Sequence, residues 1–271
     1  MGTSVTPPTL QRMDKLGDSH VLAGGNSGSE VVRVGDTVRR QPGPWSASVD
    51  ALLLHLEAVG FDGAPRALGY DELGRQVLSF IPGHVDASSG DLTESDVESV
   101  GRLVRELHDA SSTFVWPAES VWNVAIPHDE AELICHNDLA PWNLVRGGGP
   151  FAFVDWDGAG PGSRLWDLAY AAHGFALASA REGVGDEEVG VRLSALVNGY
   201  GLDEVGREGL APLLARRIRS MFELLESGKR SGVEPWAHLW DQGHGTIWHE
   251  DALYAEQHGP RWREALGLGD R

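Results

Sequence analysis

The sequence of 271 residues predicts an α+β fold in which strands and helices are segregated along the chain. Short apolar runs separated by glycine and aspartate turns fill the stretch from residue 21 to residue 81. After Gly83, apolar residues recur at helical spacing over most of the remaining chain. Because strands come first and helices follow, we expect a small antiparallel sheet and a larger helical part.

Three strands are predicted in the first forty residues, at 21–23, 30–34 and 37–40. Gly35-Asp36 is a hairpin signal between the second and third strands. A loop rich in glycine and serine separates the first two strands, and its small residues let backbone N–H groups approach a phosphate. The candidate phosphate-binding residues in this loop are Gly25, Ser27 and Gly28, and a simple hairpin turn is the alternative.

One helix is predicted inside the strand-rich region, from Ser46 as N-cap to Gly60 as stop signal. Its apolar residues recur at helical spacing: Val49, Leu52, Leu53, Leu56 and Val59. A second hairpin follows, with strands at 66–70 and 76–81.

Helices are expected over most of the chain beyond Gly83. Thr93 with Asp96 three residues later is the signature of a capped helix start, and apolar residues at helical spacing continue to His108. Further helices are predicted at 166–178, 186–199, 203–227 and 235–257.

The segment 133–157 interrupts this helical pattern and carries the most informative polar residues. Two apolar runs, 133–135 and 151–154, are predicted as short strands that end on polar side chains. The polar residues, in chain order, are His136, Asp138, Asn143, Asp155 and Asp157. The separation of Asp138 from Asn143 is that of the H-x-D-x-x-x-x-N loop of phosphoryl-transfer enzymes.

The residue types suit phosphoryl transfer. A hydroxyl that attacks a phosphate needs a carboxylate to orient it and accept its proton, a role that suits Asp138. Mg²⁺ takes oxygen ligands, which the Asn143 amide and the Asp155 carboxylate supply. The sequence therefore predicts a base and a metal site in one short segment.

The stretch CHNDLAPWNLV, followed by FVDWDGAGPGSRLWDLA, resembles the catalytic core of the aminoglycoside phosphotransferase family. The resemblance implies a bilobal, protein-kinase-like fold, with a small antiparallel-sheet N-lobe that contains one helix and a larger, mostly helical C-lobe. We expect the N-lobe to span 1–83, with the nucleotide-binding sheet and hinge. The C-lobe, 84–271, would hold the catalytic loop and the acceptor pocket.

The same resemblance assigns roles outside the catalytic loop. The backbone of Ser79, Phe80 and Ile81 would lie at the hinge and contact the nucleobase. The family's strand-three lysine, which holds the α- and β-phosphates, is absent, because the only lysines are Lys15 and Lys229. The nearest replacements are Arg39 and Arg40, and the sequence leaves the choice open.

Three acidic residues complete the expectations from the resemblance. Asp50 is the best-placed acid to pair with the strand-three cation. Asp167 resembles the family's structural acid, which fixes the catalytic segment through hydrogen bonds to its backbone. Asp157 is left open between a second metal ligand and a turn cap.

Composition limits the choice of partners. The formal net charge of −18 argues against nucleic acid and against an anionic membrane surface, and favours cationic small molecules. A general contribution to solubility explains the acidity equally well. The single cysteine, Cys135, excludes an internal disulfide and is expected to be a buried strand residue. No signal sequence or membrane span is evident, so we expect a cytoplasmic protein.

The function expected is Mg²⁺-dependent transfer of the γ-phosphate of ATP or GTP to a hydroxyl of a small molecule. An aminoglycoside or another cationic antibiotic is one candidate acceptor. Acidic residues and tryptophans of the C-terminal helices are candidate acceptor contacts: Glu223, Glu226, Trp236, Trp240, Trp248, Glu250 and Asp251. The missing lysine motivates an alternative, a non-catalytic nucleotide-binding, immunity or scaffold protein on the same fold.

Overall fold

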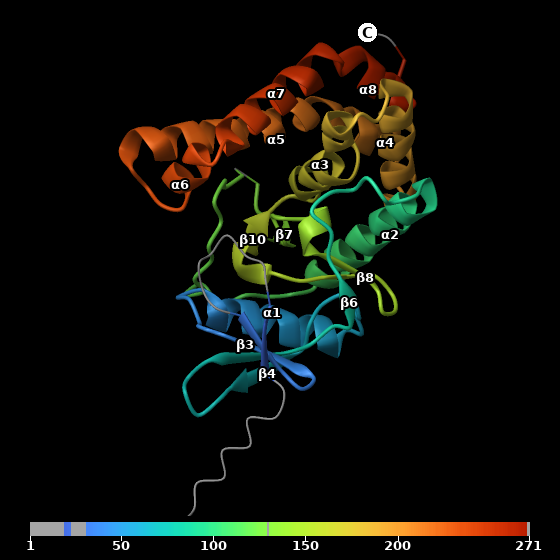
Figure 1. The fold of residues 1–271 in the computed structure, drawn as a ribbon. Helices are drawn as coiled ribbons and strands as arrows, with labels where there is room; N and C mark the ends of the chain where they lie inside the picture. The colour runs from blue at the N-terminus through green and yellow to red at the C-terminus, as the bar shows by residue number, and fades with distance from the viewer. Residues whose placement is uncertain (1–18, 23–30, 129, 270–271) are drawn as a thin grey trace, which may run out of the picture.

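The computed structural model describes residues 19–22, 31–128 and 130–269. Figure 1 shows two lobes, a small one built from a sheet and one helix and a larger one built mainly from helices. The segment that carries the predicted catalytic residues lies between them, drawn in green and yellow. This arrangement confirms the α+β, two-lobed fold expected from the sequence.

The sheet of the small lobe is antiparallel and has the strand order β1-β2-β3-β5-β4. Its strands are β1 (Ser19–Leu22), β2 (Val31–Val34), β3 (Thr37–Arg40), β4 (Ala67–Tyr70) and β5 (Gln76–Ser79). The β2–β3 hairpin turns at Gly35, whose φ of 60° favours glycine, as the Gly-Asp signal predicted. Pairing of β3 with β5 sets Arg40 directly opposite Gln76.

Helix α1 (Ser46–Ala58) packs its apolar face into the core, with Val49, Leu52, Leu53 and Leu56 buried. The expected N-cap is wrong by one residue. Trp45 occupies the N-cap position, and the Ser46 hydroxyl accepts a hydrogen bond from the Gly43 amide at 2.9 Å. Ser46 therefore closes the preceding turn and does not cap the helix.

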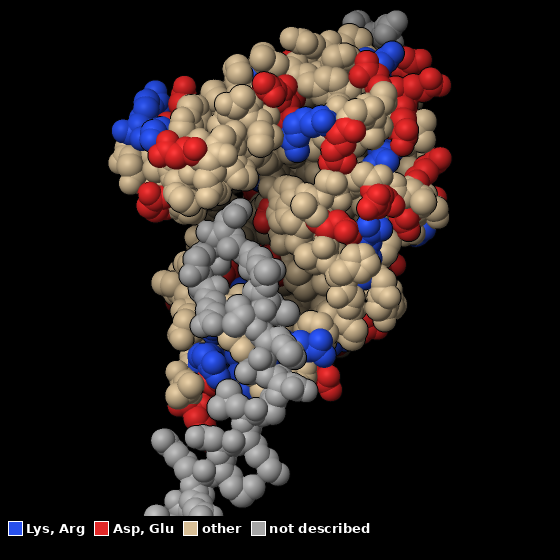
Figure 2. All heavy atoms as spheres, in the orientation of Figure 1, with Lys and Arg blue, Asp and Glu red and all other residues tan. Residues whose placement is uncertain are grey.

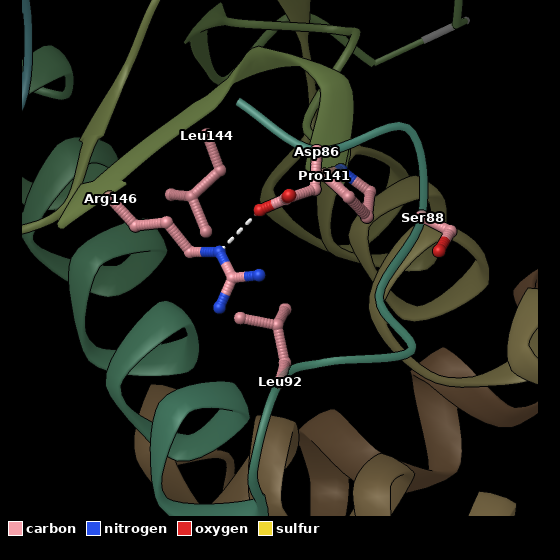
Figure 3. Close-up of a pocket in the computed structure, with 6 residues that line it drawn as sticks. All are labelled: Asp86, Ser88, Leu92, Pro141, Leu144 and Arg146. Atoms are coloured by element: carbon pink, nitrogen blue, oxygen red, sulfur yellow. Dashed lines mark hydrogen bonds and ion pairs between the residues drawn. The ribbon is translucent and has the colours of Figure 1, made fainter. Parts of the chain in front are cut away.

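A short strand connects the small lobe to the catalytic segment. Strand β6 (Gly83–His84) pairs antiparallel with β8 (Leu144–Gly147). Beside this pairing, the Arg146 guanidinium donates to the Asp86 carboxylate at 2.5 Å (Figure 3). The chain that leaves the sheet is thereby fixed against the strand that follows the catalytic loop.

The catalytic segment consists of very short elements. They are β7 (Leu133–Cys135), the 3-10 turn Pro141–Asn143, β8, β9 (Ala152–Phe153), the 3-10 turn Trp156–Gly158 and β10 (Gly160–Gly162). The sequence Gly-Pro-Gly of residues 160–162 is typical of a turn, but these residues form a strand, because β10 pairs antiparallel with β7. This pairing brings the end of the segment back to its beginning.

The large lobe packs long helices around one core, with α5 and α7 running side by side along one edge in Figure 1. The helices are α2 (Glu94–Ser111), α3 (Arg164–Phe175), α4 (Asp186–Tyr200), α5 (Glu204–Ser231), α6 (Trp236–Asp241), α7 (His244–Gln257) and α8 (Gly259–Ala265). Thr93 and Asp96 form the predicted capping box of α2. The single helix expected at 235–257 is two helices, because Gly243 adopts a φ of 95° between them.

Acidic and basic side chains are interspersed on the face drawn in Figure 2. Many of the arginines pair with carboxylates, for example Arg219 with Glu256 and Arg261 with Asp186. Among the described residues, no helix is long and apolar enough to cross a membrane.

Candidate active site

The catalytic loop begins where the buried strand β7 ends. His136 is fully buried, its Nε2 donates to the Val154 carbonyl at 3.1 Å, and its Nδ1 accepts the Asp138 amide at 3.3 Å. Asn137 adopts a φ of 66°, and its amide side chain donates to the carbonyls of Gly158 and Gly160. His136 and Asn137 thus join the loop to the segment that carries Asp155 and turn Asp138 outward.

Asp167 fixes this loop from beneath. Its fully buried carboxylate accepts the backbone amides of His136 and Asn137 at 3.1 and 2.9 Å, and a third hydrogen bond from His108. Burial pushes the pKa of Asp167 upward, but hydrogen bonding and charge at His108 outweigh it, and the pKa lies below its usual value. The structural role expected for Asp167 is confirmed.

Asp138 and Asn143 are in direct contact. The Asn143 Nδ2 donates to the Asp138 Oδ2 at 2.8 Å and to the Asp138 carbonyl at 2.9 Å. The Trp142 indole donates to the same carboxylate oxygen at 3.4 Å. Because Asn143 uses its nitrogen for these contacts, its side-chain oxygen remains for a cation.

Asp155 lies beside Asn143, because the Val154 amide donates to the Asn143 carbonyl at 2.9 Å. Its φ of 60° is unusual for a residue other than glycine and marks a strained turn after β9. Burial raises the pKa of Asp155, and the nearby Asp157 raises it further, whereas Arg40 opposes both. Such excess negative charge favours a bound cation.

The donor set fits Mg²⁺. Asn143 and Asp155 supply the amide and carboxylate oxygens that this ion prefers, and Asp157 adds a neighbouring carboxylate. The Asp155 side chain is 38% exposed, so part of it can be reached by an ion. These are the residues that would hold the ion.

The structure separates the two arginines of β3. Arg40 points toward the acids of the large lobe, with its Nη2 at 2.6 Å from Asp157 and its Nη1 at 3.6 Å from Asp155. Arg39 instead contacts Asp71 at 3.4 Å on the other side of the sheet. Of the two candidates, only Arg40 faces the site, and Asp157 is its ion-pair partner.

The expected pair between Asp50 and the strand-three cation is not direct. Gln76 lies between them: its Oε1 accepts from the Arg40 Nε at 2.7 Å, and its Nε2 donates to Asp50 at 2.6 Å. Sequence reasoning missed Gln76, since a glutamine in a short strand carries no signal until its cross-strand neighbour is known.

The predicted hinge residues lie at the end of β5, with Ser79 as its last residue and Phe80 and Ile81 after it. The Ser79 amide donates to the Arg66 carbonyl and the Phe80 amide donates to the Asp36 carbonyl, each at 2.9 Å. Those two amides are therefore engaged, and among the described residues Ile81 is the one of the three whose amide has no backbone partner. The candidate phosphate-binding residues Gly25, Ser27 and Gly28 lie outside the described residues.

Two buried residues beside the catalytic loop, Tyr170 and Arg217, were not indicated by the sequence. Both are buried, the Arg217 guanidinium lies 4.4 Å from the Tyr170 ring, and Arg217 contacts the Asn137 carbonyl at 3.4 Å. Burial raises the pKa of Tyr170 well above its usual value, and the Asp138 charge adds to this effect. Tyr170 therefore remains a neutral hydroxyl beside the catalytic loop.

The candidate acceptor contacts differ in burial, and Glu226, Trp236 and Trp240 are half-buried. Trp248 and Asp251 are buried, Trp248 against His173, and Asp251 in a hydrogen bond with His173 and an ion pair with Arg181. Glu223 and Glu250 are exposed. Cys135 is buried, as expected, and burial raises the pKa of its thiol well above the usual value.

Two comparisons with known sequences bear on the family of the chain. Residues 115–213 match the model of the phosphotransferase enzyme family. The chain is 35% identical over 245 residues to the trifolitoxin immunity protein of Rhizobium leguminosarum bv. trifolii, covering 83% of this chain and 92% of that protein.

Solved structures share the fold at low sequence identity. A choline/ethanolamine kinase family protein from Mesorhizobium loti has a TM-score of 0.63 at 18% identity and covers 95% of each chain. An amicoumacin kinase in complex with AMP-PNP, Ca²⁺ and Ami has a TM-score of 0.62 at 12% identity, covering 86% of this chain and 88% of that one. The fold is therefore that of the protein-kinase-like small-molecule kinases.

Proposed function

Because the chain belongs to the phosphotransferase enzyme family, we propose that it transfers the γ-phosphate of ATP or GTP to a hydroxyl of a small molecule. The observation that carries this proposal is the contact of Asp138 with Asn143, beside Asp155. A candidate base and an oxygen-rich cation site thus lie on one short segment, as phosphoryl transfer requires.

In the proposed reaction, Asp138 accepts a hydrogen bond from the acceptor hydroxyl, orients its oxygen toward the γ-phosphate and takes its proton. Asn143 holds the Asp138 carboxylate in place through its Nδ2. Asn143 and Asp155 would hold Mg²⁺, which neutralises charge on the phosphates when it is bound.

Arg40 would bind the nucleotide phosphates in place of the missing lysine. Its terminal nitrogens face the site and contact Asp155 and Asp157. A guanidinium can donate two hydrogen bonds to one phosphate, so it can supply the positive charge that an ammonium supplies elsewhere. The loop residues Gly25, Ser27 and Gly28 would cover the phosphates, and the Ile81 backbone would contact the base.

We propose a small organic acceptor with a free hydroxyl group. The net charge of −18 favours a cationic one, and aminoglycosides and other cationic antibiotics are the first candidates. The similar structures include proteins described as choline/ethanolamine and amicoumacin kinases, so amino alcohols extend the set. We expect the protein to act in the cytoplasm, where the nucleotide is available.

A second candidate is immunity without catalysis. A relative 35% identical to this chain is described as an immunity protein, and the strand-three lysine is absent here. In that case the protein would bind a toxic molecule or a nucleotide without transferring phosphate. Transfer measurements distinguish the two functions, because only the first requires Asp138 as a base.

The test is a transfer assay with γ-³²P-labelled ATP or GTP, Mg²⁺ and a panel of aminoglycosides and amino alcohols. We expect label on at least one acceptor with the wild-type protein and at least about a hundredfold less with Asp138→Asn. Nucleotide binding that occurs without label transfer, and that is unchanged in the variant, would favour the non-catalytic function.

A further inference from the structure

A continuous line of hydrogen bonds joins helix α1 to Arg40. The Tyr70 hydroxyl donates to the Asp50 Oδ2 at 2.8 Å, and the Asp50 Oδ1 accepts from the Gln76 Nε2 at 2.6 Å. The Gln76 Oε1 in turn accepts from the Arg40 Nε at 2.7 Å. Gln76 is fully buried, so both ends of its amide are matched within the protein.

This line fixes the direction of every hydrogen bond. Arginine has no acceptor, so the oxygen of Gln76 must face Arg40 and its nitrogen must face Asp50. Asp50 is an acceptor for both Gln76 and Tyr70. The burial and hydrogen bond that raise the pKa of Tyr70 to about 12 keep its hydroxyl a donor.

The neutral amide also determines which nitrogens of Arg40 remain for a ligand. The single amide oxygen of Gln76 accepts from one nitrogen of the guanidinium. Gln76 engages Nε alone, and Nη1 and Nη2 face Asp155 and Asp157. Gln76 therefore holds the Nε of the guanidinium, while its two terminal nitrogens are directed at the site and pair with the acids there.

We propose that Gln76 and Asp50 are positioning residues that hold Arg40 in the orientation that binds the nucleotide phosphates. The two residues act through Arg40 and do not touch the nucleotide. On phosphate binding, the terminal nitrogens turn from the acids to phosphate oxygens while Nε keeps its bond to Gln76. We call this line of hydrogen bonds, from Tyr70 through Asp50 and Gln76 to Arg40, the relay. The relay explains how an arginine can bind phosphate on a strand where related enzymes have a lysine.

The experiment measures the dissociation constant of a fluorescent ATP or GTP analogue with Mg²⁺, together with the unfolding temperature of each variant. Gln76→Leu removes the relay, and we expect its dissociation constant to rise by about tenfold or more, as for a lost hydrogen bond to a charged group. Val77→Ala is the matched control, since Val77 is a buried neighbour on the opposite face of β5. It should lower the unfolding temperature without changing nucleotide affinity.

A rescue experiment distinguishes positioning from general damage. Gln76→Glu alone places two carboxylates in contact and should weaken binding. Adding Asp50→Asn restores one donor and one acceptor at that contact. We expect the double variant to return to within about threefold of the wild-type dissociation constant.

Because the relay rests on the function proposed above, two failures must be separable. Wild-type protein that binds neither nucleotide with Mg²⁺ would overturn the proposed function and the relay with it. Wild-type binding together with unchanged affinity in Gln76→Leu would overturn the relay alone. Failure of the double variant to recover, with a normal unfolding temperature, would also overturn it.

Discussion

Asp138 is oriented before any substrate binds. Asn143 holds one carboxylate oxygen, the His136 ring accepts the Asp138 amide, and the buried Tyr170 interacts with the same carboxylate. Asp167 in turn fixes the backbone on which His136 and Asn137 stand. In the proposed reaction, a base held in place in this way would avoid the entropy cost of ordering it.

The first prediction concerns the base. Asp138→Asn keeps an oxygen for the Asn143 donor but cannot accept the proton of the acceptor hydroxyl. We expect transfer to fall by about 10²- to 10⁴-fold, the usual contribution of a general base, while the nucleotide dissociation constant is unchanged. Steady-state transfer rates and fluorescent-nucleotide titrations measure the two quantities. Wild-type transfer by the variant would remove Asp138 from its proposed role.

The second prediction concerns stability and pH. Burial and the charge of Asp157 raise the pKa of Asp155 in the folded state, so the folded state favours the protonated form. The protonated Asp155 carboxyl therefore contributes to the folding stability below its pKa in the unfolded chain, about 3.9. This contribution is lost as the pH rises through its pKa in the folded protein. Asp155→Asn should therefore unfold at a higher temperature than wild type near neutral pH without ligands, with the difference shrinking toward about pH 4. If wild type and Asp155→Asn unfolded at the same temperature both near neutral pH and at about pH 4, the predicted sign would be wrong.

Some site residues could be predicted from the sequence and others could not. Asp138, Asn143 and Asp155 lie close together in the chain, so their spacing alone indicated a shared site. The choice between Arg39 and Arg40 depends on which face of β3 meets the large lobe. Because both residues are arginine, residue type could not decide between them. Gln76 and Arg217 acquire their roles only through contacts between distant segments.

At the scale of elements, two glycines allow helices α2 and α4 to pack closely. A Cβ on Gly101 would lie 2.1 Å from the Leu196 carbonyl, and one on Gly199 would lie 2.0 Å from the Glu98 carbonyl. Helix α2 carries His108, which contacts Asp167. The close packing of α2 against α4 therefore supports the base of the catalytic loop.

The third prediction uses this packing. Gly199→Ala should destabilise the fold by about 1–3 kcal/mol or more, because the clash involves backbone that cannot give way. Gly190→Ala, in the same helix, meets only Ala265 at 3.5 Å and should stabilise the fold by roughly 0.5–1 kcal/mol through helix propensity. Urea unfolding curves of wild type and both variants measure the change in the free energy of unfolding, which should be negative for Gly199→Ala and positive for Gly190→Ala. Destabilisation of equal size in both would contradict the packing argument.

Most elements followed from local pattern, and the errors have physical causes. The capping box of α2 and the Gly35 turn are local chemistry and were predictable. The sequence of Gly160–Gly162 is typical of a turn, but the segment is a strand because it pairs with β7. Local sequence could not show this, because β7 lies far away in the chain. The break at Gly243 interrupts an apolar pattern that continues on both sides, so periodicity alone joined α6 to α7.

At the scale of the whole molecule, the ion pairs of Arg40 join the two lobes. Arg40 belongs to the sheet of the small lobe, and Asp155 and Asp157 follow β9 in the large lobe. A nucleotide with its metal would bind between these groups and replace contacts between protein charges with contacts to phosphates. Nucleotide binding should therefore depend on both lobes and on the acids that face Arg40.

The most direct test of the proposed site is thermal unfolding with ATP, GTP or neither, each with and without Mg²⁺, for wild type and Asp155→Ala. Ligand at about one hundred times its dissociation constant adds about 2.7 kcal/mol to stability. Since each kcal/mol is worth about 2–4 °C for a protein near this size, the unfolding temperature should rise by roughly 5–11 °C. We predict a Mg²⁺-dependent increase with at least one nucleotide in wild type and its loss in Asp155→Ala. No increase in wild type, or an equal increase in the variant, would contradict a metal-assisted nucleotide site at Asp155.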